Sequence, residues 1–256
     1  MDLLTIAFLA GTGVVAGIIA AMVGGAAVVI YPALIATGVS PQLAAVSILA
    51  AVMPATMLAA LSDRSQLPPF NRAFIGLIVA SVIGAGAGAA LLLLTPERMF
   101  AQIVPLLIGF ATLLFAGAER ITRWMRARAE GRGHDITFNL ASLKVVLPVS
   151  VYGGYFGAGV GILMLGVFSL ATGGDYRAAN VVKNFISSLN GLAATLVFAT
   201  HDAILWPQTL ALAAGTIGGG LIGAYAARVI PRNVVRFLIV AVGVALTVVL
   251  ARRYWF

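Results

Sequence analysis

The sequence contains no cysteine and very little charge. Without cysteine, disulfide bonds, thiolate metal ligands and a cysteine nucleophile are all excluded. Asp, Glu, Lys and Arg make up only 9% of the 256 residues, whereas a soluble domain carries about 25% to cover its surface. No Asp, Glu, Lys, Arg or His occurs in the 60 residues from Leu3 to Ser62. These absences exclude a soluble enzyme, a DNA-binding domain and a secreted scaffold.

Apolar residues dominate instead, because 61% of the chain is hydrophobic and the mean hydropathy is +1.07. A transmembrane helix needs about 20 such residues in a row. Only helices and closed barrels satisfy their backbone polar groups in lipid, and barrel strands alternate polar and apolar residues, which these runs do not. The composition therefore predicts an all-α polytopic protein of the inner (plasma) membrane, with the lipid bilayer as its surroundings.

The formal charge of +8 is distributed unevenly along the chain. Six of the 16 basic residues lie between Arg120 and Lys144. Basic residues gathered in one connection are typical of a cytoplasmic loop of a membrane protein, so the charge indicates topology and no nucleic-acid partner. The N-terminus has neither a basic segment nor a small-residue cleavage site before its apolar run, so we interpret this run as a membrane span.

Charges and prolines divide the chain into three parts. We expect a first membrane repeat at residues 1–118, a basic cytoplasmic loop at 119–138 and a second membrane repeat at 139–256. Arg120, Arg123 and Trp124 are expected to continue the helix that precedes the loop. Each repeat contains four apolar segments, which are 3–37, 41–62, 73–95 and 99–118, then 138–172, 175–200, 203–228 and 231–251.

The two repeats carry similar features in the same order. A Thr-Gly pair at Thr37 and at Thr172 precedes an Ala-Ala pair, and a glycine-rich run follows at 84–88 and at 218–223. Membrane sequences rich in Gly and Ala can align by chance, but this order over about 100 residues favours two homologous four-helix halves. Many secondary transporters are built from such repeats.

The first apolar segment of each half is too long for one span. A helix over residues 3–37 would measure about 50 Å, against a hydrocarbon core of about 30 Å. We predict that the first helices break at Gly24-Gly25 and at the glycines of residues 153–161; close helix packing is the alternative role for these glycines. If both segments double back there, the halves are inverted; if both cross once, the halves are parallel. The arginine count favours inverted halves, because four arginines of the second half then join the side of the basic loop.

Lys183 is the one charge well inside a predicted span. A charge there costs roughly 2.5–3.5 kcal/mol, so it normally faces a partner or an aqueous cavity. Asn180, Lys183, Asn184 and Ser187 follow helical spacing and form one polar stripe. A substrate-facing stripe is the favoured interpretation; hydrogen bonding to a neighbouring helix and snorkelling of Lys183 to the interface are the alternatives. A fixed cation beside amide and hydroxyl groups suits an anion.

These features resemble the sulfite exporter TauE/SafE family. The first half is similar in Gly24-Gly25, Pro32, Gly38 and residues 44–47. The second half is similar in residues 157–161, the run 177–180, Lys183-Asn184-Phe185, Asn190 and residues 203–207, and the similarity extends from about Gly11 to Leu250. The resemblance implies a duplicated carrier of about eight spans that moves sulfite, sulfonates or related organic and sulfur-containing anions.

The leading hypothesis is a secondary transporter of a small anion such as sulfite, an organosulfonate or a related sulfur-containing anion. Broken helices would present backbone N–H groups at Gly24, Gly25, Gly159 and Gly161. Lys183 would supply charge and Ser47, Asn184 and Asn190 hydrogen bonds, with Asn180 in the same stripe. A non-transporting scaffold or channel-like protein is the alternative.

An enzyme is disfavoured, because the sequence has no acid–base pair within a span and no phosphate-binding loop in a strand–helix context. His134 and His201 each precede an Asp at a span end, where such a pair is usually solvated. We expect no metal and no cofactor. The anion, the direction of transport, the coupling ion and homo-oligomer formation stay open.

Overall fold

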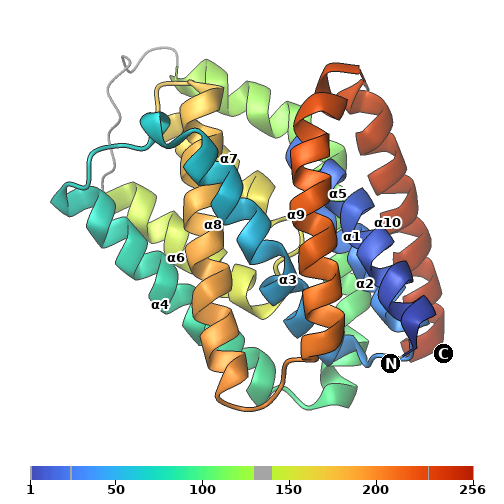
Figure 1. Ribbon diagram of the computed structural model, residues 1–256. Helices are drawn as coiled ribbons and strands as arrows, with labels where there is room; N and C mark the ends of the chain where they lie inside the picture. Colours follow the sequence, from blue (N-terminus) through green and yellow to red (C-terminus); the bar gives the residue numbers. More distant parts are fainter. Residues whose placement is uncertain (1, 24, 130–139, 230, 256) are drawn as a thin grey trace.

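The computed structural model describes every residue except 1, 24, 130–139, 230 and 256 (Figure 1). The described part is all-helical and contains no β-strand, as predicted. A short 3₁₀ turn, η1, covers Arg64–Gln66. The α-helices are α1 (Leu3–Val23), α2 (Ala26–Ala36), α3 (Pro41–Ser62), α4 (Arg72–Leu94), α5 (Glu97–Ala129), α6 (Leu140–Tyr155), α7 (Val160–Ala171), α8 (Tyr176–Ala199), α9 (Trp206–Val229) and α10 (Arg232–Trp255).

Six of these helices are long and apolar enough to cross a membrane, and they are α1, α3, α4, α5, α8 and α10. Large apolar side chains cover their outer faces, since Leu94 is 80% exposed, Leu113 72% and Phe237 71%. Helix α5 extends to Ala129 and so includes Arg120 and Arg123, as expected. A multi-pass membrane protein follows from these lengths and surfaces.

The over-long first segment of each half is broken, as predicted. In the first half α1 ends at Val23 and α2 begins at Ala26, after Gly25 with a φ of +95°. In the second half α6 ends at Tyr155 and α7 begins at Val160, after Gly159 with a φ of +80°. Glycine adopts this left-handed conformation without the steric cost that a Cβ would impose. Each half therefore contributes the two helix ends at its break to the interior of the molecule. Gly24 lies outside the described residues.

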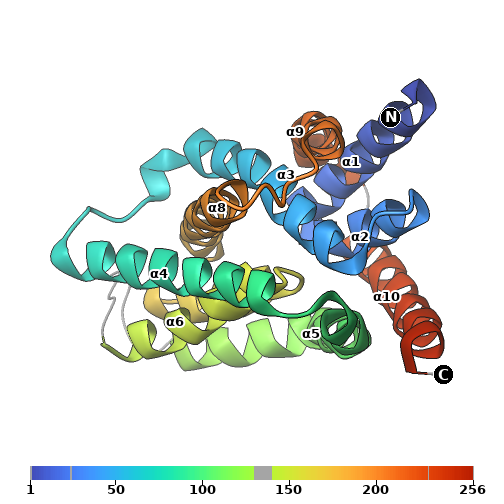
Figure 2. The ribbon, with the colours of Figure 1, turned by 90° about the horizontal axis from the view of Figure 1, so that it is seen from below.

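Helices from different halves pack tightly against each other through glycines. Figures 1 and 2 show α1 beside α9 and α4 beside α6. A Cβ on Gly13 would lie 2.5 Å from the carbonyl oxygen of Leu212, and one on Gly17 would contact the backbone of Thr216 and Gly220. Gly84 and Gly88 meet the backbone of α6 in the same way. These contacts are the close approach that small residues permit between membrane helices.

Helices α3 and α8 pack antiparallel at the centre. Arg177 at the start of α8 bonds Asp63 after the end of α3, Ser188 lies next to Met57, and Gly191 lies next to Met53. Helices α5 and α10 are antiparallel too. Arg236 pairs with Glu119 at 2.8 Å, and the Trp255 indole donates to the carbonyl oxygen of Gln102 at the other end.

Candidate functional site

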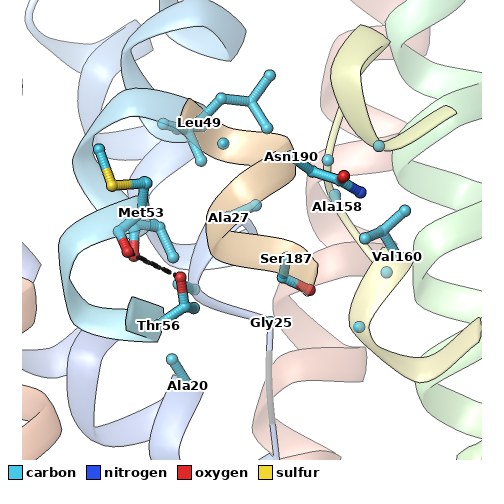
Figure 3. A pocket seen from close by; sticks show the side chains of 18 of the residues that line it. Ala20, Gly25, Ala27, Leu49, Met53, Thr56, Ala158, Val160, Ser187 and Asn190 are labelled. Atoms are coloured by element: carbon cyan, nitrogen blue, oxygen red, sulfur yellow. Dashed lines mark hydrogen bonds between the residues drawn. The ribbon is translucent and has the colours of Figure 1, made fainter. Parts of the chain in front are cut away.

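A cavity of about 140 Å³, called here the deep cavity, lies where the two helix breaks meet α3 and α8. Gly25, Ala26 and Ala27 line it from the first break, and residues 157–162 line it from the second. Figure 3 shows Leu49, Met53 and Thr56 entering from α3 and Ser187 and Asn190 from α8. Four elements that are far apart in the sequence thus surround one space.

Lys183 lies in the wall of this cavity, about two turns inside α8. Helix α8 begins at Tyr176, because the Asp175 side chain caps it by accepting bonds from the N–H groups of Arg177 and Ala178. The Lys183 ammonium donates to Asn180 Oδ1 at 2.8 Å. Neither of the two ion pairs among the described residues includes Lys183. Among the described residues, its positive charge therefore has an amide partner but no carboxylate partner.

The other polar side chains of α8 differ in whether they already form hydrogen bonds within the protein. Asn190 is buried, accepts a bond from Ser81 at 2.5 Å and donates to Ser150 at 3.2 Å, while Ser81 and Ser150 bond each other. Ser187 has a buried hydroxyl without a partner within the described part of the chain. Asn184 lines the cavity, and no described residue bonds its side chain. Ser187 and Asn184 can thus serve a ligand, whereas Asn190 mainly holds α8 against α4 and α6.

The beginnings of α2 and α7 both reach the deep cavity. The first N–H groups of a helix lack intrahelical partners and carry partial positive charge. Gly25 fits there because a Cβ would lie 2.6 Å from the Phe115 ring, and Gly157 because a Cβ would lie 2.6 Å from Leu49 Cδ2. Two helix N-termini and one ammonium thus give this space positive character.

A second cavity of about 330 Å³, called here the outer cavity, continues from the deep one. Both are lined by Ala20, Ala26, Val52, Thr56, Lys183 and Asn184. The outer cavity extends along α8 to Asn180, Arg177 and Asp63, where Arg177 holds the Asp63 carboxylate through bonds of 2.6 and 2.9 Å. Lys183 therefore lies at the junction between an interior space and a wider one near the helix ends.

The structure brings together most of the residues singled out in the sequence. Gly25, Gly159, Gly161, Lys183, Asn184 and Asn190 line the deep cavity, and Asn180 lines the outer one. Ser47 is fully buried on α3, and its hydroxyl has no partner among the described residues. Ser47 lines neither cavity, so its role in binding stays a prediction, and Gly24 lies outside the described residues.

Sequence reasoning did not select the residues of α3 that line the cavity. These are Ile48, Leu49, Val52, Met53 and Thr56. Their side chains are the types that lipid-facing and core positions use, so nothing in the sequence separates them from the rest of α3. Ser187 does carry a signal, because it belongs to the polar stripe of α8.

The helices and the internal cavity define the class as a multi-pass α-helical membrane protein. The family comparison gives the particular group. The chain belongs to the sulfite exporter TauE/SafE family, whose model matches residues 9–250. This match confirms the resemblance drawn from the sequence motifs and makes the chain a member of a membrane transporter family.

Two relatives have similar length. A Haemophilus influenzae protein named "Probable membrane transporter protein" is 25% identical over 247 residues, which cover 96% of this chain and 94% of the relative. A Sinorhizobium protein named "Probable membrane transporter protein ORF9" is 27% identical over 252 residues, which cover 95% and 91% of the two chains. No solved structure matches the chain.

Proposed function

We propose that this protein is a secondary transporter that moves a small anion, such as sulfite, an organosulfonate or a related sulfur-containing anion, across the inner membrane. The observation that carries the proposal is Lys183, a cation in the wall of an interior cavity whose described surroundings hold no carboxylate partner. A charge inside a membrane protein is costly unless something compensates it. A transported anion supplies that compensation.

The neighbours of Lys183 support an anion over a cation. Asn184 and Ser187 offer an amide N–H and a hydroxyl from the same face of α8. The N-termini of α2 and α7 add backbone N–H groups and the positive ends of two helix dipoles. Discontinuous helices that point their N-termini at a mid-membrane substrate are a recurring device of secondary transporters.

Inverted halves form part of this proposal. Helix α8 is the counterpart of α3 in the order of elements, and α10 is the counterpart of α5. Counterparts that pack antiparallel, as both of these pairs do, are expected when one half is turned over relative to the other. The basic loop then lies in the cytoplasm together with Asp63, Arg177 and Arg236.

The test is a panel of anions offered to the purified, reconstituted protein. Proteoliposome uptake and thermal stabilisation are measured with sulfite, alkanesulfonates, sulfate and small carboxylates. We expect at least one anion to be taken up and to raise the melting temperature, because a ligand that binds only the folded state stabilises it. A panel without any response would refute anion transport.

A further inference from the structure

The two sides of the deep cavity differ in chemistry. The α8 side presents Lys183, Asn184 and Ser187. The α3 side is apolar over a full turn and more, through Ile48, Leu49, Val52 and Met53, and its one hydroxyl, Thr56, already donates to the Met53 carbonyl oxygen at 2.9 Å. Figure 3 shows Leu49 and Met53 on the α3 side of the space, separate from Ser187 and Asn190 on α8.

The charge in the cavity suits an anion of a single charge. Lys183 is the one charged side chain among the residues that line the deep cavity. One ammonium compensates one negative charge in full, whereas a second negative charge would meet only the partial positive charges of the α2 and α7 N-termini, beside apolar side chains. Burying an unpaired charge is far more costly than burying a paired one. Sulfate and other dianions are therefore poorly matched to this space.

The apolar wall suits a ligand that carries more than a charged group. An inorganic oxyanion held at Lys183 would leave Leu49 and Met53 facing water or empty space. An organic body placed against these side chains would remove apolar surface from water on both partners, which is favourable. The volume of the deep cavity is only about 140 Å³, so the body must be short.

We infer that the deep cavity selects a singly charged organic anion with a short apolar body over inorganic oxyanions. The charged group binds at Lys183, Asn184 and Ser187, and the body packs against Leu49 and Met53. The inference rests on the proposed transport of anions and narrows its substrate class. Leu49 and Met53 are then specificity-determining residues.

A homologous series of ligands tests the inference on the full-length protein. Affinity is measured for methane-, ethane-, propane- and butanesulfonate, with sulfite and sulfate alongside. Each added methylene should tighten binding by about threefold to fourfold, the equivalent of about 0.8 kcal/mol, until the cavity is full, and both inorganic anions should bind more weakly than ethanesulfonate. Equal affinity along the series, or preference for sulfite or sulfate, would overturn the inference.

Variants of α3 test whether Met53 is responsible for the gain in affinity per methylene. Met53→Gln keeps the length of the side chain but makes it polar, so the gain per methylene should fall while methanesulfonate affinity holds. Met57→Gln is the matched control one turn away, because Met57 lines neither cavity, and it should keep the wild-type gain. Met53→Leu stays apolar and should keep the gain as well. If Met53→Gln fails to fold, the wild-type series still decides.

Failure of this inference is distinguishable from failure of the transport proposal. If sulfite binds and is transported in a Lys183-dependent way without any gain from methylenes, transport stands and the inference fails. If no anion binds, both fail.

Discussion

Lys183 holds its charge in an interior wall with a single amide oxygen as its described hydrogen-bond partner. The mildest estimates put the cost of a charge within a membrane at roughly 2.5–3.5 kcal/mol. A residue that contributed only to stability would be better replaced by an apolar one. The cost of this intramembrane charge is explained if the ammonium binds a ligand. Helix bonding and snorkelling are the alternative explanations, and a substitution of Lys183 has a different effect under each of the three.

Lys183→Met should abolish anion transport and anion-dependent thermal stabilisation, while the melting temperature without ligand holds or rises. The substitution removes the attraction for the anion and also removes the cost of an intramembrane charge. Lys144→Met, at an exposed position near the start of α6, is the control and should change neither property. A fall in melting temperature without ligand would mean that Lys183 bonds helices together. Wild-type transport by Lys183→Met would end its role as counter-charge.

Asn184 and Asn190 should respond differently to truncation. Asn184→Ala should weaken anion binding by roughly tenfold or more, since a hydrogen bond to a charged group contributes about 1.5–3 kcal/mol, and should leave the apo melting temperature nearly unchanged. Asn190→Ala should lower the free energy of unfolding by about 1–3 kcal/mol, because it removes two buried hydrogen bonds and leaves the hydroxyls of Ser81 and Ser150 with only each other. Calorimetry with and without anion separates the two, and equal losses of stability would contradict this division.

Among the helices, two pairs from different halves depend on backbone contact. Gly88 lies against the backbone of Val151 and Tyr155, so that an added Cβ would be 2.8 Å from the Tyr155 nitrogen. Gly86, half a turn earlier on α4, has open space at the same position. The same helix therefore offers one glycine that packing requires and one that it does not.

Gly88→Ala should destabilise the protein by about 1–3 kcal/mol, because backbone atoms must move to admit the methyl group. Gly86→Ala should be neutral or stabilising by up to about 1 kcal/mol, since alanine is the better helix former. Thermal unfolding in detergent measures both. Equal behaviour of the two variants would mean that α4 and α6 do not approach as closely as described.

The sequence predicted the elements better than the contacts between them. Uninterrupted apolar runs and the over-long first segments located the spans and the breaks, because hydrophobicity and length act locally along the chain. The glycine-rich runs at 84–88 and 218–223 looked equivalent, yet the contacts use Gly84 and Gly88 in one half and Gly215 and Gly219 in the other. Gly218 and Gly220 face open space. Which glycine meets a neighbour, and that Leu49 and Met53 face a cavity, depend on the packing of distant helices.

For the whole molecule, the proposed inverted arrangement of the halves predicts that two exposed positions lie on opposite sides of the membrane. Ser65 lies two residues beyond Asp63, which bonds the start of α8, and His201 follows its end. Helix α8 has 24 residues and so measures about 36 Å. We expect a cysteine at Ser65 to react with membrane-impermeant reagents only from the cytoplasm, and one at His201 only from outside. The chain has no native cysteine to interfere, and the reverse pattern would contradict the orientation.

The pairing of α1 with α9 also bears on how the protein is made. Helix α1 leaves the ribosome before α9, the helix that accepts Gly13 and Gly17. Helix α9 emerges about 180 residues later, which at 5–20 residues per second takes roughly 10 to 40 s. During that interval the glycine face of α1 lacks the helix that covers it in the folded structure. Helix α4 is likewise synthesised before its partner α6, although the interval is shorter. Neither half can complete its packing alone, because the contacts of α1 with α9 and of α4 with α6 form only after α9 and α6 have entered the membrane.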